Sequence, residues 1–118
     1  MHTIVTEQPF SATSLKEELI AKLQSRSANV AVIGLGYVGL PLALLFTERG
    51  FRVTGFDTDG AKINMLDSLR SYICRIPQPE IALASDRGFK ATADFTRISE
   101  MDAIVICVPT PLTEYREP

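Results

Sequence analysis

Short apolar runs alternate along the chain with segments in which apolar residues recur every three or four positions. A short run that is apolar throughout is typical of a parallel strand covered on both faces, and β-branched or aromatic residues favour strands generally. The clearest such run is AIVICV, which precedes the last ten residues of the chain. The pattern predicts strands at residues 30–33, 51–57, 89–92 and 103–108.

Helical spacing fills the intervals between these strands. In the first interval Pro41 is tolerated because it falls in the first helical turn, and Gly50 is expected to end the helix. Before the third helix, Pro77 and Pro79 are expected to break an irregular segment, SYICRIP. The expected helices are residues 37–49, 61–69 and 80–87, and residues 98–101 are expected to form a turn or short helix.

Residues 1–28 are expected to form an extension followed by one helix. Ser14 with Glu17 three residues later matches a capping box, in which each side chain satisfies a free backbone amide at the helix start. An apolar stripe runs along this helix and consists of Leu15, Leu19, Ile20 and Leu23. We expect the stripe to pack on the edge of the same domain, and a contact between subunits is the alternative.

The order strand, helix, strand, helix, strand, strand predicts an α/β fold with a Rossmann-like, doubly wound parallel sheet. The expected strand order is 3-2-1-4, which is the first half of a dinucleotide-binding fold. Residues 1–28 would then be an extension with its helix, and residues 29–118 a truncated Rossmann domain. Because half a fold with an exposed last strand is an unusual end for a natural protein, we expect a fragment of a longer chain.

Composition narrows the class of protein. The 118 residues are 46% hydrophobic and 22% charged, as in a soluble globular domain, and the net charge of −2 provides no basic excess for nucleic acid. The apolar runs are shorter than the ~20 residues of a membrane-spanning helix, and the N-terminus does not resemble a secretory signal. Cys74 and Cys107 have neither metal-site nor disulfide spacing, which favours a reducing cytoplasm.

Residues 34–39 read GLGYVG, which is a G-x-G-x-x-G pattern. Three glycines alone are weak evidence, but these follow an apolar strand, open a helix and precede an acidic residue at the end of the next strand. That context indicates a dinucleotide-binding loop, and a purely structural glycine turn is the alternative. The candidate cofactor-binding residues here are Gly34, Leu35, Gly36, Tyr37, Val38 and Gly39.

Each glycine has its own expected role in such a loop. Gly34 allows the tight turn out of the strand, Gly36 removes a side chain where a pyrophosphate approaches, and Gly39 lets the helix lie close to the sheet. The amides of Tyr37 and Val38 are then expected to point toward the phosphates, aided by the positive end of the helix dipole.

Asp57 lies eighteen residues after Gly39, at the end of the second predicted strand. A carboxylate there accepts hydrogen bonds from the ribose hydroxyls of adenosine and repels a 2′-phosphate, which favours NAD over NADP. Lys62 softens that preference, since it follows one helical turn later. A helix cap is the alternative role for Asp57, although Asp59 is the better candidate for the cap.

Val108, Pro109, Thr110 and Pro111 follow the last predicted strand, at the edge where ligands bind in this fold. We expect Val108 and Pro109 to line the cofactor site and the Thr110 hydroxyl to contact a ribose or phosphate, and a simple strand terminator is the alternative. Cys107 is expected to be a small core residue. The sequence shows no catalytic set and no metal cluster, so no residue here is a catalytic or metal-ligating candidate.

Residues 29–112 resemble the N-terminal domain of the UDP-glucose/GDP-mannose dehydrogenase family. The motifs that carry the resemblance are GYVGLP after Gly34-Leu35, D-x-D-x-x-K from Asp57 to Lys62, SYICRIP, and VPTP from Val108 to Pro111. In that family Asp57 and Lys62 would hold the adenosine ribose, and the glycine loop would hold the pyrophosphate of NAD.

The resemblance implies oxidation of a nucleotide sugar at C6, from alcohol through aldehyde to carboxylate, with two NAD. The family's nucleophilic cysteine lies far downstream with its lysine and asparagine partners, in segments that this chain does not include. The central and UDP-sugar-binding domains would also lie there, so the fragment alone is expected to be inactive. The complete enzyme is expected to be a cytoplasmic homo-oligomer.

The N-terminal helix and the S-Y-I-x-x-I-P segment resemble most the UDP-N-acetylglucosamine 6-dehydrogenase branch, which would place the enzyme in polysaccharide biosynthesis. UDP-glucose and UDP-N-acetylmannosamine 6-dehydrogenases are alternatives. A β-hydroxyacid-type dehydrogenase shares the I-G-L-G start, but Tyr37-Val38 and Asp57-Thr58 count against it. A non-catalytic NAD-binding module is the alternative from another class.

Overall fold

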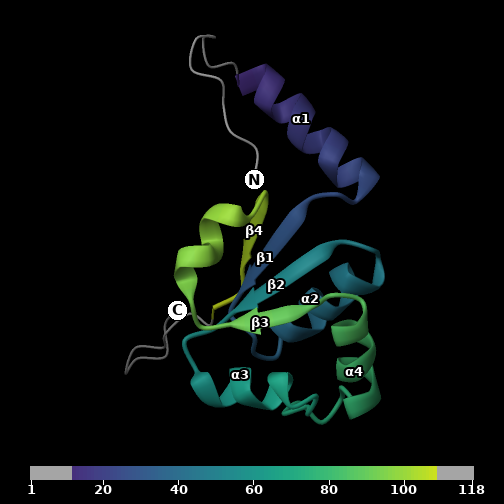
Figure 1. The fold of residues 1–118 in the computed structure, drawn as a ribbon, viewed down its shortest axis with the longest axis vertical. Coiled ribbons are helices and arrows are strands. Elements are labelled where there is room, and N and C mark those ends of the chain that lie inside the picture. Colours follow the sequence, from purple (N-terminus) through teal and green to yellow (C-terminus); the bar gives the residue numbers. More distant parts are fainter. Residues whose placement is uncertain (1–11, 109–118) are drawn as a thin grey trace, which may run out of the picture.

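Four parallel strands form one sheet in the order β3-β2-β1-β4 (Figure 1). The structure, a computed structural model, describes residues 12–108. The predicted α/β class and the predicted strand order are both confirmed, because each buried strand lies where its apolar pattern indicated. The strands are β1 (Asn29–Ile33), β2 (Arg52–Phe56), β3 (Lys90–Thr92) and β4 (Ala103–Ile106).

Helices connect these strands, and their boundaries differ from the predicted ones by one to three residues; α2, for example, begins at Gly39 and not at Tyr37. Pro79 does not break the chain, because it lies in the first turn of a helix, where a missing amide costs no internal hydrogen bond. The short helix before β4 starts earlier than predicted, since the Asp94 side chain accepts from the Thr96 amide and begins it. The helices are α1 (Ala12–Ser25), α2 (Gly39–Glu48), α3 (Gly60–Asp67), α4 (Gln78–Asp86) and the 3-10 helix η1 (Phe95–Glu100).

The core lies on one face of the sheet, beneath α2, α3 and α4. Alternate residues of the strands point to this face. Helix α2 ends just before Gly50, whose φ of 95° terminates the helix as predicted. Among the buried residues are Val30, Val32, Val53, Leu40, Ala43, Ile63, Ile81 and Ala84. No helix within residues 12–108 is long and apolar enough to cross a membrane.

The opposite face of β4 is largely uncovered by the described residues. Ala103 and Val105 pack against the core, whereas Ile106 is 67% exposed and Ile104 and Val108 are also exposed. β4 ends at Ile106, two residues earlier than predicted. The outer strand of the sheet therefore presents apolar side chains to solvent.

Helix α1 extends away from the sheet (Figure 1), and Lys22 in its last turn bonds to Asp102 beside β4. Leu15, Ile20 and Leu23 are exposed, so the prediction that the apolar stripe packs on the domain's own edge is wrong. The predicted capping box is also wrong, because the helix already includes Ala12 and Ser14 therefore lies inside it. Contacts between subunits stay a prediction for this stripe.

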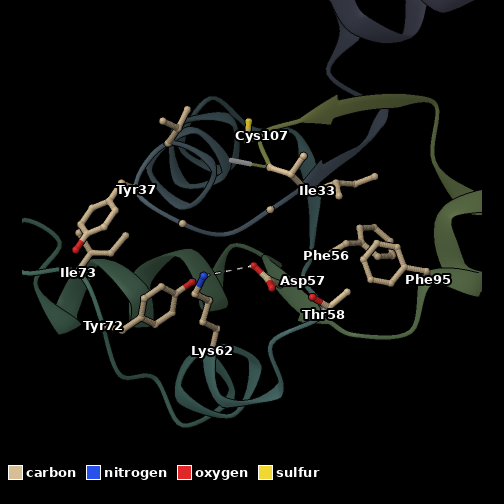
Figure 2. A pocket seen from close by; sticks show the side chains of 14 residues that line it. Ile33, Tyr37, Phe56, Asp57, Thr58, Lys62, Tyr72, Ile73, Phe95 and Cys107 are labelled. Carbon is tan, nitrogen blue, oxygen red and sulfur yellow. Dashed lines mark ion pairs between the residues drawn. The ribbon is translucent and has the colours of Figure 1, made fainter. Parts of the chain in front are cut away.

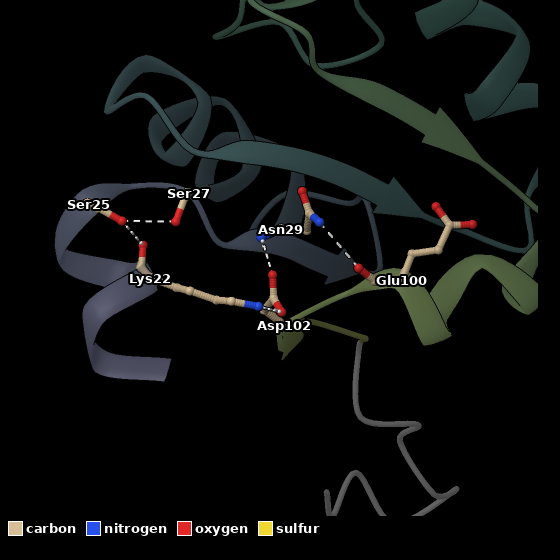
Figure 3. Close-up of polar contacts among 6 residues, drawn as sticks. All are labelled: Lys22, Ser25, Ser27, Asn29, Glu100 and Asp102. Carbon is tan, nitrogen blue, oxygen red and sulfur yellow. Dashed lines mark hydrogen bonds and ion pairs between the residues drawn. The ribbon is translucent and has the colours of Figure 1, made fainter. Parts of the chain in front are cut away.

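A single carboxylate ties α1 to the start of the sheet (Figure 3). Asp102 accepts a hydrogen bond from the Asn29 amide at 2.9 Å and another from Lys22 Nζ at 2.9 Å. The Asn29 amide bond holds the pKa of Asp102 below its usual value; burial acts in the opposite direction, and Lys22 adds to the lowering. Asp102 thus joins α1, β1 and β4 at one point.

We predict that Asp102→Asn lowers the free energy of unfolding by about 1 kcal/mol at pH 7, since a charge-assisted pair is lost. A carboxylate whose folded pKa is lowered stabilises the fold above its unfolded pKa, near 4, and stops doing so as pH falls through the folded pKa. Urea unfolding should show the difference between the two proteins shrinking as the pH falls below about 4. A difference independent of pH would contradict this role.

Candidate functional site

A pocket of about 860 Å³ opens at the carboxyl ends of β1, β2 and β4 (Figure 2). Because the chain leaves β1 toward β2 on one side and β4 lies on the other, this is the point where strand order reverses, and ligands bind there in open parallel sheets. The lining residues are Ile33, Gly34, Gly36, Tyr37, Val38, Phe56, Asp57, Thr58, Lys62, Tyr72, Ile73, Phe95, Cys107 and Val108.

The glycine loop passes very close to the neighbouring strands. The Gly34 amide donates to the Phe56 carbonyl at 2.8 Å, and its φ of +94° is one that residues with a side chain rarely adopt. A Cβ at Gly34 would also lie 2.9 Å from backbone atoms of Cys107. Only glycine therefore fits where the loop runs between the ends of β2 and β4.

Gly39 and Gly36 differ in what surrounds them. A Cβ on Gly39 would collide with the Gly34 carbonyl and lie 3.3 Å from Cys107 Cβ. The lack of a side chain at Gly39 therefore lets the start of α2 pack against both the beginning of the loop and the end of β4. A Cβ on Gly36 would meet nothing within 4 Å. The backbone at Gly36 is thus open on the side that lines the pocket, where a ligand can approach it.

Unpaired backbone amides follow this open position. Within the part of the chain that the structure describes, the Tyr37 and Val38 amides donate to no other group, and both side chains are exposed. Helix α2 begins at Gly39, so these amides lie at its N-terminal end, where the helix dipole is positive. The loop can therefore bind an anion, as expected of a phosphate-binding helix start.

Asp57 follows β2 directly and faces the loop. Its Oδ2 accepts from the Leu35 amide at 2.9 Å, its Oδ1 accepts from the Asp59 amide at 2.8 Å, and Lys62 Nζ lies 3.8 Å from Oδ2. Burial acts to raise the pKa of Asp57, but the Leu35 and Asp59 amides and the Lys62 charge outweigh it and hold this pKa below its usual value. The carboxylate is therefore charged and acts only as an acceptor.

Asp59, not Asp57, caps α3. The Asp59 side chain accepts from the Ala61 amide at 2.9 Å, as the sequence predicted. Lys62 then lies one turn into α3 and points back toward Asp57 (Figure 2). This local arrangement leaves the Asp57 carboxylate directed to the pocket and the loop.

Tyr72, which the sequence analysis left in an irregular segment, is part of the same group. Its hydroxyl donates to the Leu35 carbonyl at 2.6 Å, and Lys62 Nζ lies 5.9 Å from the centre of its ring. Burial raises the pKa of Tyr72, and the negative charges of Asp57 and Asp59 raise it further. No periodic pattern marks this tyrosine; only its place in the family-like SYICRIP segment could have drawn attention to it.

An aromatic pair forms another wall that sequence reasoning missed. Phe95 from η1 packs on Phe56 at the end of β2, with ring centroids 5.5 Å apart, and both residues line the pocket beside Thr58. Phe56 is fully buried, whereas Phe95 is partly exposed. The pocket thus has an apolar side next to the acidic and cationic groups.

The other predicted site residues differ in whether their side chains reach the pocket. The Leu35 side chain is buried beneath Gly55, so only its backbone belongs to the site. Val108 lines the pocket, and Pro109 and Thr110 lie outside the described residues. Cys107 packs against the core as predicted and also lines the pocket, and no metal-binding group exists among the described residues.

One family model covers most of the chain. A model of the UDP-glucose/GDP-mannose dehydrogenase family, NAD binding domain, matches residues 28–118. UDP-N-acetyl-D-glucosamine 6-dehydrogenase of Salmonella typhi is 37% identical over 90 residues, which are 76% of this chain and 20% of that protein.

Solved structures give the same result. A UDP-glucose dehydrogenase from Pyrobaculum islandicum matches with a TM-score of 0.67 and 30% identity, over 74% of this chain and 21% of that one. A GDP-mannose dehydrogenase from Pseudomonas aeruginosa, solved as a ternary complex, matches with a TM-score of 0.64 and 29% identity, over 75% and 21%. The chain spans about a fifth of the length of these relatives.

We predict that Gly39→Ala destabilises the fold by about 2 kcal/mol or more, because the added methyl must displace the Gly34 carbonyl. Gly36→Ala places its methyl in open space and should change the free energy of unfolding by less than about 0.5 kcal/mol. Urea unfolding of both variants measures the difference. Equal destabilisation by the two alanines would contradict the described loop geometry.

Proposed function

This chain belongs to the UDP-glucose/GDP-mannose dehydrogenase family, and on that premise we propose that it holds the NAD of a nucleotide-sugar 6-dehydrogenase. The residues that match are the NAD-binding domain of such enzymes. The whole protein would oxidise UDP-N-acetylglucosamine or a related UDP-sugar at C6 to the uronic acid. The single observation that carries the proposal is the charged Asp57 bonded to the glycine loop within one pocket.

The described residues fit NAD. The backbone at Gly36 is open, so a pyrophosphate can approach it without meeting a side chain. The unpaired amides of Tyr37 and Val38 can then donate to its negatively charged oxygens. Each Asp57 oxygen accepts one amide and retains room for a ribose hydroxyl. NAD supplies a hydride acceptor when it is bound.

NAD is favoured over NADP because a 2′-phosphate would lie against the negative charge of Asp57. Lys62 does not reverse this preference, because its ammonium group is already paired with that carboxylate. On the other side of the pocket we assign Val108 to the cofactor site, together with Pro109 and Thr110 beyond it. The partly exposed Phe95 ring, which packs on the buried Phe56, supports the assignment by offering an apolar surface to the adenine.

Relatives that share this domain carry names with three different sugars: UDP-N-acetyl-D-glucosamine, UDP-glucose and GDP-mannose. The presence of the domain therefore does not by itself identify the sugar. We assign UDP-N-acetylglucosamine because of the similarity to the Salmonella typhi relative and the S-Y-I-x-x-I-P segment. We assign the complete enzyme to the cytoplasm as a homo-oligomer that serves polysaccharide biosynthesis.

Asp57→Ala should weaken NAD binding by about 10- to 100-fold, since hydrogen bonds from ribose hydroxyls to a charged acceptor are lost. NADP binding should weaken less, because the same change removes the repulsion of its 2′-phosphate. Isothermal titration with both dinucleotides measures the two effects. Asp67→Ala, which removes an exposed carboxylate at the end of α3, is the matched control and should leave both affinities unchanged.

The full-length protein that contains this chain should form about two NADH per sugar, because oxidation of an alcohol to a carboxylate removes four electrons as two hydrides. The measurement compares UDP-N-acetylglucosamine, UDP-glucose and UDP-N-acetylmannosamine in parallel by absorbance of NADH. NAD binding without turnover of any of these sugars would disprove the proposal. It would leave a β-hydroxyacid-type dehydrogenase or a non-catalytic NAD-binding module.

A further inference from the structure

The peptide groups on both sides of Leu35 are held by side chains that line the pocket. The Leu35 amide donates to Asp57 Oδ2 at 2.9 Å, and the Leu35 carbonyl accepts from the Tyr72 hydroxyl at 2.6 Å. The Leu35 side chain is fully buried, so neither peptide group can turn by moving the residue outward. Leu35 is therefore held at both of its peptide groups and at its side chain.

The hydrogen bond from Tyr72 to the Leu35 carbonyl also fixes the direction of the next amide. The carbonyl of Leu35 and the amide of Gly36 belong to one planar peptide unit, so the direction of one determines the direction of the other. Gly36 itself has no side chain to restrict its dihedral angles, and its Cβ side is open. The Gly36 carbonyl accepts from the Leu40 amide at 3.1 Å, so the Tyr37 and Val38 amides lie between the held Leu35 peptide unit and the first turn of α2, and their orientation depends on both.

We propose that Tyr72 is a positioning residue for the pyrophosphate of NAD, whose hydroxyl holds the glycine loop in the conformation that presents the Tyr37 and Val38 amides. This inference rests on the proposed function. Tyr72 comes from the segment between α3 and α4, outside the glycine loop and the β2 end that mark dinucleotide-binding folds. It deepens the proposed site by assigning a residue that acts on the cofactor through the loop.

The segment that carries Tyr72 is itself firmly anchored. Ser71 Oγ accepts from the Ile73 amide at 3.2 Å and donates to the Ile73 carbonyl at 2.9 Å, which closes a local turn around Tyr72. Ile73 and Ile76 are both buried in the core. The Tyr72 hydroxyl is therefore attached to the same core as the sheet, and it can restrain the loop rather than follow it.

Two further contacts support the assignment. Lys62 Nζ lies above the Tyr72 ring and 3.8 Å from Asp57, so one tyrosine contacts both the loop and the cation that pairs with the ribose-binding carboxylate (Figure 2). Because the pKa of Tyr72 is raised, its hydroxyl keeps its proton and remains a donor throughout the physiological pH range.

The test uses Tyr72→Phe, which keeps the ring under Lys62 and removes only the hydroxyl. We expect binding of NAD and of ADP, both of which contain a pyrophosphate, to weaken by about 3- to 10-fold, the usual effect of one lost hydrogen bond. Adenosine, which lacks the pyrophosphate, should bind within about twofold of the unchanged protein. Titration calorimetry measures NAD and ADP, and NMR titration measures adenosine.

If Tyr72 only stabilised the fold, Tyr72→Phe would weaken the binding of NAD, ADP and adenosine alike. Equal weakening for adenosine, or no weakening for NAD and ADP, would overturn the inference. Ser25→Ala is the matched control, since it also removes a hydroxyl that donates to a backbone carbonyl, at Lys22, and lies on α1 outside the pocket. It should leave all three affinities unchanged.

A second measurement does not depend on any ligand. Hydrogen exchange of the Leu35 and Leu40 amides, which donate to Asp57 and to the Gly36 carbonyl, should become faster in Tyr72→Phe than in the unchanged protein, while exchange in β1 and β2 stays the same. Unchanged loop exchange would contradict the restraint itself. If the unchanged protein binds neither NAD nor ADP, the proposed function fails, whereas normal binding with no effect of Tyr72→Phe disproves only this inference.

Discussion

The passage of the glycine loop between the ends of β2 and β4 is the constraint on which the site depends. Gly34 donates to the Phe56 carbonyl and lies too close to the Cys107 backbone for any side chain, and a side chain on Gly39 would collide with the Gly34 carbonyl. A loop this tight sets the start of α2 at the edge of the sheet. It also brings the Leu35 amide within hydrogen-bond distance of the residue that follows β2.

The polarity of the pocket follows from that geometry. One side offers unpaired amides at a helix start, and the other offers a carboxylate that stays charged although it is largely buried. Burial alone would favour the neutral form of Asp57, so the amides of Leu35 and Asp59 are what preserve its charge. Unpaired amides and a charged acceptor thus lie side by side, and in the proposed function they would bind the pyrophosphate and the ribose of NAD respectively.

Some structural features could be predicted from the sequence, and others could not. Strand order and the Asp59 cap were predicted correctly, because they depend on apolar runs, chain direction and neighbours within two residues. The position of α1 was predicted wrongly, because an apolar stripe shows that a surface needs a partner but does not identify it. Pro79 was taken as a break because the pattern around it does not show where a helix begins, and a proline in a first turn looks the same in sequence.

The sequence by itself determined the parallel sheet, the glycine loop and the acidic residue after β2, because short-range spacing and backbone sterics are sufficient for each. Only the tertiary structure decided that Tyr72 reaches the Leu35 carbonyl and that Lys22 reaches Asp102, since these partners are 37 and 80 residues apart. Neither side chain belongs to a periodic pattern, and both contacts exist only after the core has placed their segments together. The residue that holds the loop was therefore hidden in a segment without regular structure until the fold brought it there.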